Sequence, residues 1–557
     1  MIPEIKPEVT SEIPPESPQE TIPPVPPEPL TEVVSVIPPV VVPRNRWQRF
    51  LHWEYLGLFI ILLTTLVFHF IAIEHPPTIV WDEVWYVGDT RSIVSGTGEL
   101  RPEHPPLAKL FIVAGEFIFN GFKIPEKDTG ATTYQYVGGN KDNDTTIQVS
   151  DASKFTVDTT IRIESEQMTV KTINQALNQI TVERQTDGTV AVGHATQQKI
   201  YVYTDNAFGW RFFSIIFGTL GIVLFYFICR KLGFSWKATM IATFLFAFED
   251  MTFLHSGLAL LDVYMVTFML AAVLAYLDEK YILMGVFVAL SANCKLAGVL
   301  ILIAIFIHWA IYRKDKWKSF SLSLVVAAVS FVVFLWFFDF FIKGGFENPI
   351  TRINSMFTST AANIFTPNAT NSAPKLSISS RPWTWIYPQS VALQNNYNAP
   401  FITYSYNPWY ISFISTTIQI MIIPTIGYMI YKAIFAVKKS AVAGLVLLWF
   451  LATYIVWMPL GAPIRFKVFS TLVQTNRVTF VFYFLSTTPA ICIGIAMAIS
   501  DWLEHLKKRR AELNRLSTGI ALSYGTIGLY LALHLAIFIL YLGLTSIFTT
   551  FKPPFAR

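Results

Sequence analysis

Charged residues are scarce in this chain. Only 14% of its 557 residues are Asp, Glu, Lys or Arg, whereas soluble globular domains carry about 25%. Hydrophobic residues make up 53% of the sequence, and they gather in long apolar runs. This combination excludes an ordinary soluble domain and indicates a protein that crosses a membrane several times.

Cysteine is also rare. The three cysteines, Cys229, Cys294 and Cys492, lie far apart, in or beside apolar runs. Their spacing matches no metal-binding or redox motif, so we expect them to be small buried hydrophobic residues. No His/Asp cluster has metal spacing either, although an adjacent Asp-Glu pair could hold a divalent ion. We therefore expect neither a metal nor a cofactor.

The apolar runs predict an all-α polytopic membrane protein with about eleven transmembrane helices. The run at 280–293 is short, which leaves open that it forms one broken element with its neighbour. The candidate spans are 55–73, 211–229, 237–254, 258–277, 280–293, 297–312, 319–342, 408–430, 441–459, 478–500 and 519–547.

Basic residues precede the first span and follow spans two, six, eight and ten, and they set the expected orientation. If the spans alternate, five basic clusters fall on one side, and the positive-inside rule makes that side cytoplasmic. The N-terminus is then cytoplasmic and the C-terminus external, and the net charge of +5 requires no nucleic-acid partner. The clusters are Arg44, Arg46 and Arg49; Arg230, Lys231 and Lys237; Arg313, Lys314, Lys316 and Lys318; Lys432, Lys438 and Lys439; and Lys507, Lys508, Arg509 and Arg510.

The first external loop changes character in its middle. Apolar and polar residues alternate in TTIQV, TTIRIE, QMTVKTI, QITVERQ and QKIYVY, with turn residues between them, which predicts a small all-β insert. A spacer role and a role in binding a partner or substrate both stay open. The predicted order is a disordered Pro/Glu-rich cytoplasmic tail (1–43), the first span with external amphipathic helices (44–128), the β insert (129–204), spans two to seven (205–342), an external loop (343–407) and spans eight to eleven (408–557).

Two acidic residues, Asp82 and Glu83, come soon after the first span, and His104 and Lys109 follow in the same loop. A carboxylate at a membrane surface can deprotonate a hydroxyl, and His and Lys can hold a phosphate. Adjacent residues on a helix point about 100° apart. We therefore expect Asp82 to act directly and Glu83 to orient an acceptor or a basic neighbour.

Six segments in order resemble the protein O-mannosyltransferase family, in particular its prokaryotic branch within the GT-C class of membrane glycosyltransferases. The resemblance covers roughly residues 55–500 apart from the β insert. The segments are WDEVWYVGDTRSIV, EHPPLAKLFIVAGEFIF, FGWRFFSIIFGTLGI, HSGLALLDVYMVTF, CKLAGVL and SRPWTW.

The resemblance implies a helical bundle with its active site on the external face. It also implies a polyprenyl- or dolichyl-phosphate-mannose donor and transfer to Ser or Thr hydroxyls of exported proteins, by an enzyme that can be a homo- or hetero-oligomer. Two departures stand out. Related sequences have an arginine where this chain has Gly257, and eukaryotic members carry their extra β domain in the later large loop.

On this interpretation Asp82 is the general base of a single inverting step, with Glu83 beside it. A phosphate leaving group needs nearby cations rather than a strong acid. The candidate donor-binding residues are His104, Lys109, Arg211, Lys295, and Arg381 with Trp383. Asp262 and Arg477 lie in or beside apolar runs, where ionisable residues are usually paired or functional.

Three other interpretations stay open. A related GT-C enzyme would move another lipid-linked sugar to a lipid or glycan. A transporter could use Asp262 and Lys295 as an ion path, although the two halves of the chain show no internal repeat. A non-catalytic family member would explain Gly257. We expect a prokaryotic plasma membrane, or the endoplasmic reticulum if the source is eukaryotic.

Overall fold

The computed structural model describes the central part of the chain and much of its C-terminal part. The predicted tail (1–43) and much of the predicted loop 343–407 lie outside it. The described residues are 53–74, 77–80, 82–314, 316–361, 381–386, 391–393, 397–399, 404–406, 410–437, 439–462, 465–468, 471–474, 477–513 and 517–541.

Long apolar helices dominate the described residues. Six of them are long and apolar enough to cross a membrane, or up to seven if one bent pair counts as a single span. The six are α2 (Trp53–Ala72), α5 (Ala207–Lys231), α11 (Trp317–Lys343), α13 with its π-helical continuation (Thr416–Phe435), α14 to α15 (Ala441–Gly461) and α17 (Thr518–Tyr541).

The other apolar helices are mostly shorter. Each of the eleven predicted runs contains a helix, but the count of eleven spans stays a prediction because several of these helices are too short to cross a bilayer alone. They are α6 (Trp236–Ala247), α7 (Asp250–Gly257), α8 (Leu261–Leu277), α9 (Tyr281–Cys294), α10 (Leu300–Tyr312) and α16 (Thr488–Leu513).

The predicted span 237–254 is wrong in one respect, because the chain breaks within it. Helix α6 ends at Ala247, and Glu249 starts α7 by accepting a hydrogen bond from the backbone N–H of Thr252. A second break follows, and α8 leaves α7 at an angle of 112°. The first break is marked by the acidic pair Glu249 and Asp250, whereas the second falls in the apolar residues 258–260, where hydropathy gives no sign of it.

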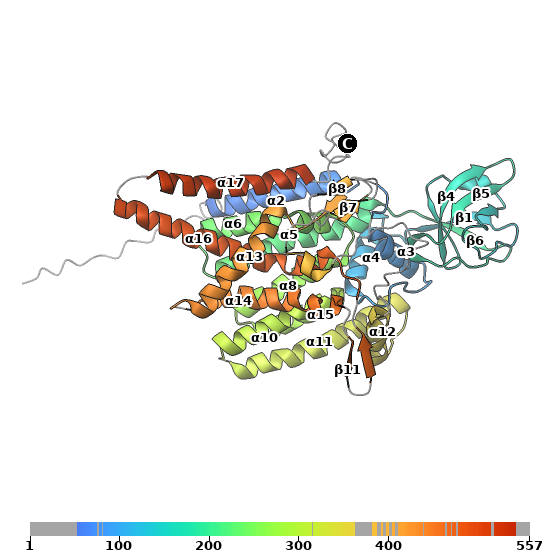
Figure 1. The fold of residues 1–557 in the computed structure, drawn as a ribbon. Coiled ribbons are helices and arrows are strands. Elements are labelled where there is room, and N and C mark those ends of the chain that lie inside the picture. The colour runs from blue at the N-terminus through green and yellow to red at the C-terminus, as the bar shows by residue number, and fades with distance from the viewer. Residues whose placement is uncertain are drawn as a thin grey trace, which may run out of the picture. The chain divides into compact units, whose positions relative to one another are not determined.

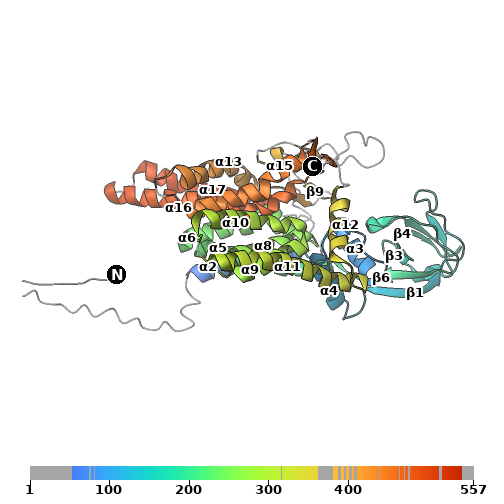
Figure 2. The same ribbon diagram turned by 90° about the horizontal axis from the view of Figure 1, so that it is seen from below.

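Helix α8 lies inside the bundle, packed against α5 and α9, and α11 covers the other side of α9 (Figures 1 and 2). It is apolar all round and almost entirely buried, as expected for a helix at the centre of a helical core. Helix α2 instead exposes large side chains such as Phe59 and Ile60, which suits a surface that faces lipid.

The β insert is a six-stranded antiparallel sheet in the order β1-β6-β3-β4-β5-β2 (Figure 1). Backbone hydrogen bonds from Tyr134 to Gln148 and from Ser150 to Thr132 join the end of β1 to β2, so the sheet curls into a small barrel around its own apolar core. The strands are β1 (Glu126–Thr132), β2 (Thr146–Gln148), β3 (Thr160–Ile163), β4 (Glu166–Asn174), β5 (Gln179–Glu183) and β6 (Lys199–Tyr203).

Sequence alternation identified five of these strands and missed β1. That strand reads EKDTGAT and has almost no apolar residues to alternate. It is held by pairing with β6, where Glu126 lies opposite Tyr203, and its position depends on the partner strand more than on local propensity.

Two short helices, α3 (Glu83–Val94) and α4 (Leu107–Phe119), connect the bundle to the insert (Figure 2). The Gln167 side-chain amide donates to the carbonyl of Gly88 and contacts the Ser92 hydroxyl, both at 2.9 Å. A Cβ on Gly88 would lie 2.1 Å from the carbonyl oxygen of Asp187. Only glycine allows this close approach, so α3 and the insert are fitted to each other.

Candidate active site

Asp82 stands at the start of α3 and lines a cavity of about 290 Å³. Its side chain makes no capping hydrogen bond to the helix, so the carboxylate is available to the cavity. The residues around the cavity are Asp82, Trp85, Tyr86, Arg101, Glu103, His104, Lys295, Arg477, Val478, Phe480, Phe482 and Tyr483.

The surroundings of Asp82 make it a stronger base than an exposed aspartate. Burial raises the pKa of its carboxyl to about 7, with Lys295 opposing the rise and Asp262 adding to it. A carboxylate with a pKa near neutral can both hold and release a proton at physiological pH.

Lys295 brings a positive charge to the same cavity from the turn after α9. Its ammonium group lies 2.8 Å and 2.9 Å from the two carboxylate oxygens of Asp262, at the start of α8. It also lies 5.3 Å from the ring centre of Phe482 and 5.2 Å from that of Tyr483. The structure therefore pairs two residues that sequence analysis singled out separately.

Two arginines complete the positive side of the cavity. Within the described residues, the Nε atoms of Arg101 and Arg477 are buried without a hydrogen-bond partner. The Arg101 guanidinium stacks 3.9 Å from the ring centre of Trp85. Its Nη1 atom lies 3.9 Å from a carboxylate oxygen of Glu103. Buried donors without partners are costly, and an anionic ligand in the cavity would satisfy them.

Arg101 was missed by the sequence analysis. Its position three residues before His104, in the same loop, could have indicated that it belongs to the candidate site. His104 itself lines the cavity, with its ring 5.7 Å from that of Tyr86. Burial, followed by the charges of Lys295 and Lys109, holds the pKa of His104 well below its usual value. The imidazole is therefore neutral at pH 7 and offers a hydrogen bond rather than a charge.

Glu83 points away from the cavity into a buried ion pair. Arg211 on α5 donates to it twice, from Nε at 2.8 Å and from Nη2 at 2.7 Å. The backbone N–H groups of Val80 and Ala259 also donate to this carboxylate, at 3.0 Å and 2.9 Å. Glu83 thus ties the start of α3 to α5 and to the break between α7 and α8.

Lys109 is likewise buried outside the cavity. Its ammonium group contacts Asp89 at 2.7 Å and Glu99 at 2.6 Å. Glu99 continues the network to Arg352 of α12 (Pro349–Ala361) at 2.8 Å. These contacts satisfy the lysine within the protein, and the structure does not bring it to Asp82.

Arg381 and Trp383 also lie outside the set of residues that line the cavity. Arg381 donates to the carbonyl of Gly461, and its guanidinium lies 5.8 Å from the Trp383 ring centre. Gly257 ends α7, where a Cβ would lie 3.0 Å from a ring carbon of His69 on α2. A larger residue there would have to displace that histidine.

The described residues contain no group of three or more His, Cys, Asp or Glu side chains that could hold a metal ion. Asp82 and Glu83, adjacent in sequence, face different surroundings, since Glu83 is fully engaged by Arg211. The pair does not form a shared ligand set.

A family of known proteins matches part of the chain. The model of the family described as dolichyl-phosphate-mannose-protein mannosyltransferase matches residues 189–346, a segment that includes Arg211, Asp262 and Lys295. No curated protein sequence matches the chain.

Several solved structures align with the chain, and the first of them closely enough to share its fold. The S. cerevisiae protein O-mannosyltransferase Pmt1-Pmt2 complex bound to the sugar donor aligns with a TM-score of 0.55 at 11% identity, over 88% of this chain and 90% of that chain. An Archaeoglobus fulgidus oligosaccharyltransferase aligns at 0.45 and 13% identity over 88% and 56% of the two chains. ArnT from Cupriavidus metallidurans bound to undecaprenyl phosphate aligns at 0.45 and 12% identity over 88% and 72%.

The family match and the likeness to the yeast complex confirm the resemblance on which the sequence analysis relied. The apolar helices agree with a multi-pass membrane protein. The chain therefore has the fold of a membrane glycosyltransferase of the GT-C type, and its residues 189–346 match the dolichyl-phosphate-mannose-protein mannosyltransferase family.

Proposed function

We propose that this enzyme transfers mannose from a polyprenyl- or dolichyl-phosphate-mannose donor to Ser or Thr hydroxyls of exported proteins. One observation carries the proposal. A single cavity holds the accessible carboxylate of Asp82 together with Lys295, Arg101 and Arg477. A base and a set of phosphate-neutralising cations are the two things that this transfer requires.

In the proposed reaction, the acceptor hydroxyl oxygen attacks C1 of the sugar as its proton passes to Asp82. The bond between C1 and the phosphate oxygen breaks, and the lipid phosphate leaves with its electron pair. The new bond forms on the opposite face of C1, so the configuration inverts. The released phosphate stays an anion and needs cations rather than a proton donor.

We assign the leaving phosphate to Arg477, Arg101 and Lys295, and a hydrogen bond to neutral His104. The unpartnered Nε atoms of the two arginines support this assignment. Lys295 remains anchored by Asp262, which keeps its charge at one place. Glu83 and Arg211 then act as positioning residues that fix where α3 begins, and Lys109 stabilises the loop that carries His104.

The membrane geometry follows from the same assignment. A lipid-linked donor keeps its chain in the bilayer while its sugar reaches an aqueous face, and the basic clusters in the sequence support an external position for that face. Lys295 is held in a salt bridge with Asp262. A fixed, paired charge of this kind favours a ligand-binding site over an ion path.

The test uses the full-length protein in lipid nanodiscs with radiolabelled polyprenyl-phosphate-mannose and a Ser/Thr-rich peptide. We expect label on the peptide with wild type and none with Asp82→Asn. Asp142→Asn is the matched control, because Asp142 is exposed on the insert and should leave transfer unchanged.

Two results would overturn the proposal. One is transfer from a different lipid-linked sugar, with none from the mannose donor, and this would move the enzyme to the neighbouring GT-C activity. The other is a normal rate with Asp82→Asn, which would remove the proposed base.

A further inference from the structure

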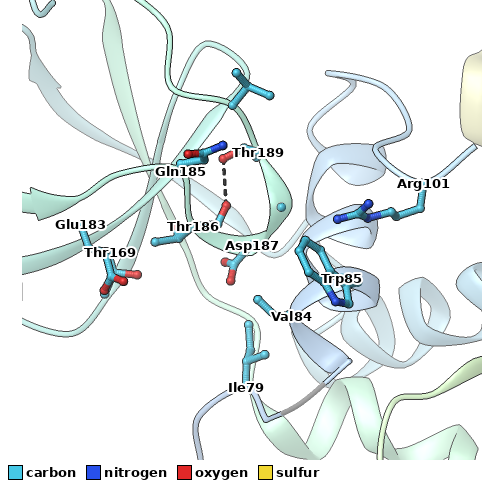
Figure 3. Close-up of a pocket in the computed structure, with 12 residues that line it drawn as sticks. Ile79, Val84, Trp85, Arg101, Thr169, Glu183, Gln185, Thr186, Asp187 and Thr189 are labelled. Atoms are coloured by element: carbon cyan, nitrogen blue, oxygen red, sulfur yellow. Dashed lines mark hydrogen bonds between the residues drawn. The ribbon is translucent and has the colours of Figure 1, made fainter. Parts of the chain in front are cut away.

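A second hollow adjoins the catalytic cavity on the side of the β insert. This cleft has a volume of about 640 Å³. Its bundle side is formed by Ile79, Val84, Trp85 and Arg101 (Figure 3). Its insert side is formed by the 185–190 loop together with Thr169 of β4 and Glu183 of β5, which lie opposite each other in the sheet.

The cleft and the catalytic cavity share a wall. Trp85 and Arg101 line both hollows, and they stack on each other at 3.9 Å. Figure 3 shows this pair facing the loop of the insert across the cleft. The cleft and the Asp82 cavity therefore adjoin each other at the Trp85–Arg101 pair.

The loop that closes the cleft is fixed in place. Gln185 and Asp187 adopt left-handed backbone conformations, with φ of 58° and 53°, which persist only where the surroundings enforce them. Arg91 of α3 holds Asp187 at 2.6 Å. A Cβ on Gly188 would lie 3.0 Å from the Trp85 ring. The insert is thus a fitted wall of the cleft rather than a spacer.

Resting on the function proposed above, we infer that this cleft binds the polypeptide acceptor on either side of the hydroxyl to be glycosylated. Its lining mixes an exposed tryptophan and aliphatic side chains with hydroxyl, amide and carboxylate groups. Such a surface suits a peptide, whose backbone offers donors and acceptors and whose side chains vary.

Other occupants fit the cleft less well. Arg101 is the one cation among the described lining residues, beside Glu183 and Asp187, and it is already stacked on Trp85. A phosphorylated lipid headgroup calls for several cations. The donor's own phosphate has its cations in the catalytic cavity, on the other side of the Trp85–Arg101 pair.

The experiment attaches a bulky group to the cleft after the protein has folded. All three native cysteines are buried, so an introduced surface cysteine can be labelled selectively with a large maleimide. Val190→Cys places the label in the cleft, where Val190 is 66% exposed. Leu177→Cys is the matched control, because Leu177 is 57% exposed on the same insert and lies outside the cleft.

Four quantities are measured before and after labelling: KM and kcat for a Ser/Thr-rich peptide, KM for polyprenyl-phosphate-mannose, and the rate of mannose release from the donor to water. We expect the label on Val190→Cys to raise the peptide KM at least about tenfold, a loss of about 1.4 kcal/mol in binding. Donor KM and mannose release should not change. The label on Leu177→Cys should change none of them.

An unchanged peptide KM after labelling Val190→Cys would overturn the inference and leave the proposed function standing. Absence of both mannose release and peptide transfer in the unlabelled enzyme would instead contradict the proposed function. Binding of a fluorescent peptide to the Asp82→Asn protein, blocked by the label on Val190→Cys and not by the label on Leu177→Cys, would support the inference independently of turnover.

Discussion

Arg211 of α5 and Glu83, the first residue of α3, form a bidentate ion pair that joins α3 to the bundle. The neighbouring carboxylate, Asp82, faces the cavity instead. Two adjacent acids therefore have different roles, because one of them is fully satisfied by protein donors and the other is not.

Breaking that pair should weaken the fold more than the chemistry. Glu83→Gln removes the carboxylate charge from a buried ion pair, and breaking such a pair typically costs about 3–5 kcal/mol. We expect a clearly lower Tm in detergent for Glu83→Gln and for Arg211→Met. The double variant should lose less than the sum of the two, with a coupling energy of about 0.5–3 kcal/mol. Simple additivity would mean that the two residues act separately.

The rate should depend on the ionisation of Asp82. The base works only when deprotonated, and its pKa lies near 7. We expect kcat/KM to fall about tenfold per pH unit on the acid side of pH 7. The pKa of His104 lies well below its usual value. His104 should therefore add no second titration to the pH–rate profile near pH 7.

A substitution of Lys295 tests whether Asp82 is the group that titrates in the dependence of kcat/KM on pH. The charge of Lys295 lowers the pKa of Asp82, so removing it with Lys295→Met should move the acid limb to higher pH. A limb that stays in place, or moves to lower pH, would assign the titration to another group.

Arg477 should contribute chiefly to departure of the phosphate. Removing one preorganised group that stabilises developing charge typically costs a factor of about 10² to 10³ in rate. We expect a loss of this size in kcat with Arg477→Met and partial recovery with Arg477→Lys, at unchanged Tm. A loss of Tm matching the loss of rate would indicate a structural role.

Lys109 should behave differently from Arg477. Lys109→Met leaves Asp89 and Glu99 buried without their shared cation, so we expect a lower Tm and a lower yield of folded protein. The donor KM of the protein that does fold should stay close to wild type. A selective rise in donor KM at normal stability would restore the phosphate-binding role expected from sequence.

Gly88→Ala should loosen the insert from α3. Its Cβ would collide with the carbonyl of Asp187, so we expect faster proteolysis within the insert and a reduced rate of transfer to peptide. Gly525→Ala is the control, since a Cβ there meets nothing within 4 Å. Equal proteolysis of both variants would show that α3 and the insert are not closely fitted.

Three residues of the candidate cavity, Asp82, His104 and Lys295, could be singled out from the sequence because they are polar residues beside apolar runs. Asp82 was recognised as an acid directly after a hydrophobic span, and Lys295 as a cation between two apolar runs. The sequence-based assignment of Lys109 to the donor phosphate was not supported, and the reason is physical. Nearness in sequence suggested nearness to Asp82, but α4 turns the lysine toward Asp89 and Glu99. The cleft depends on the contact between α3 and a loop of the insert, which no local pattern records.

The backbone hydrogen bonds that join the end of β1 to β2 leave little open strand edge on the insert. Exposed strand edges are the places where extended chains add themselves to a sheet, both in recognition and in aggregation. An unfolded polypeptide passing the insert therefore meets side chains rather than a ladder of free backbone groups. Under the proposed function, this surface would guide many different chains past Asp82 and release each of them afterwards, because no sheet has to be taken apart when the product leaves.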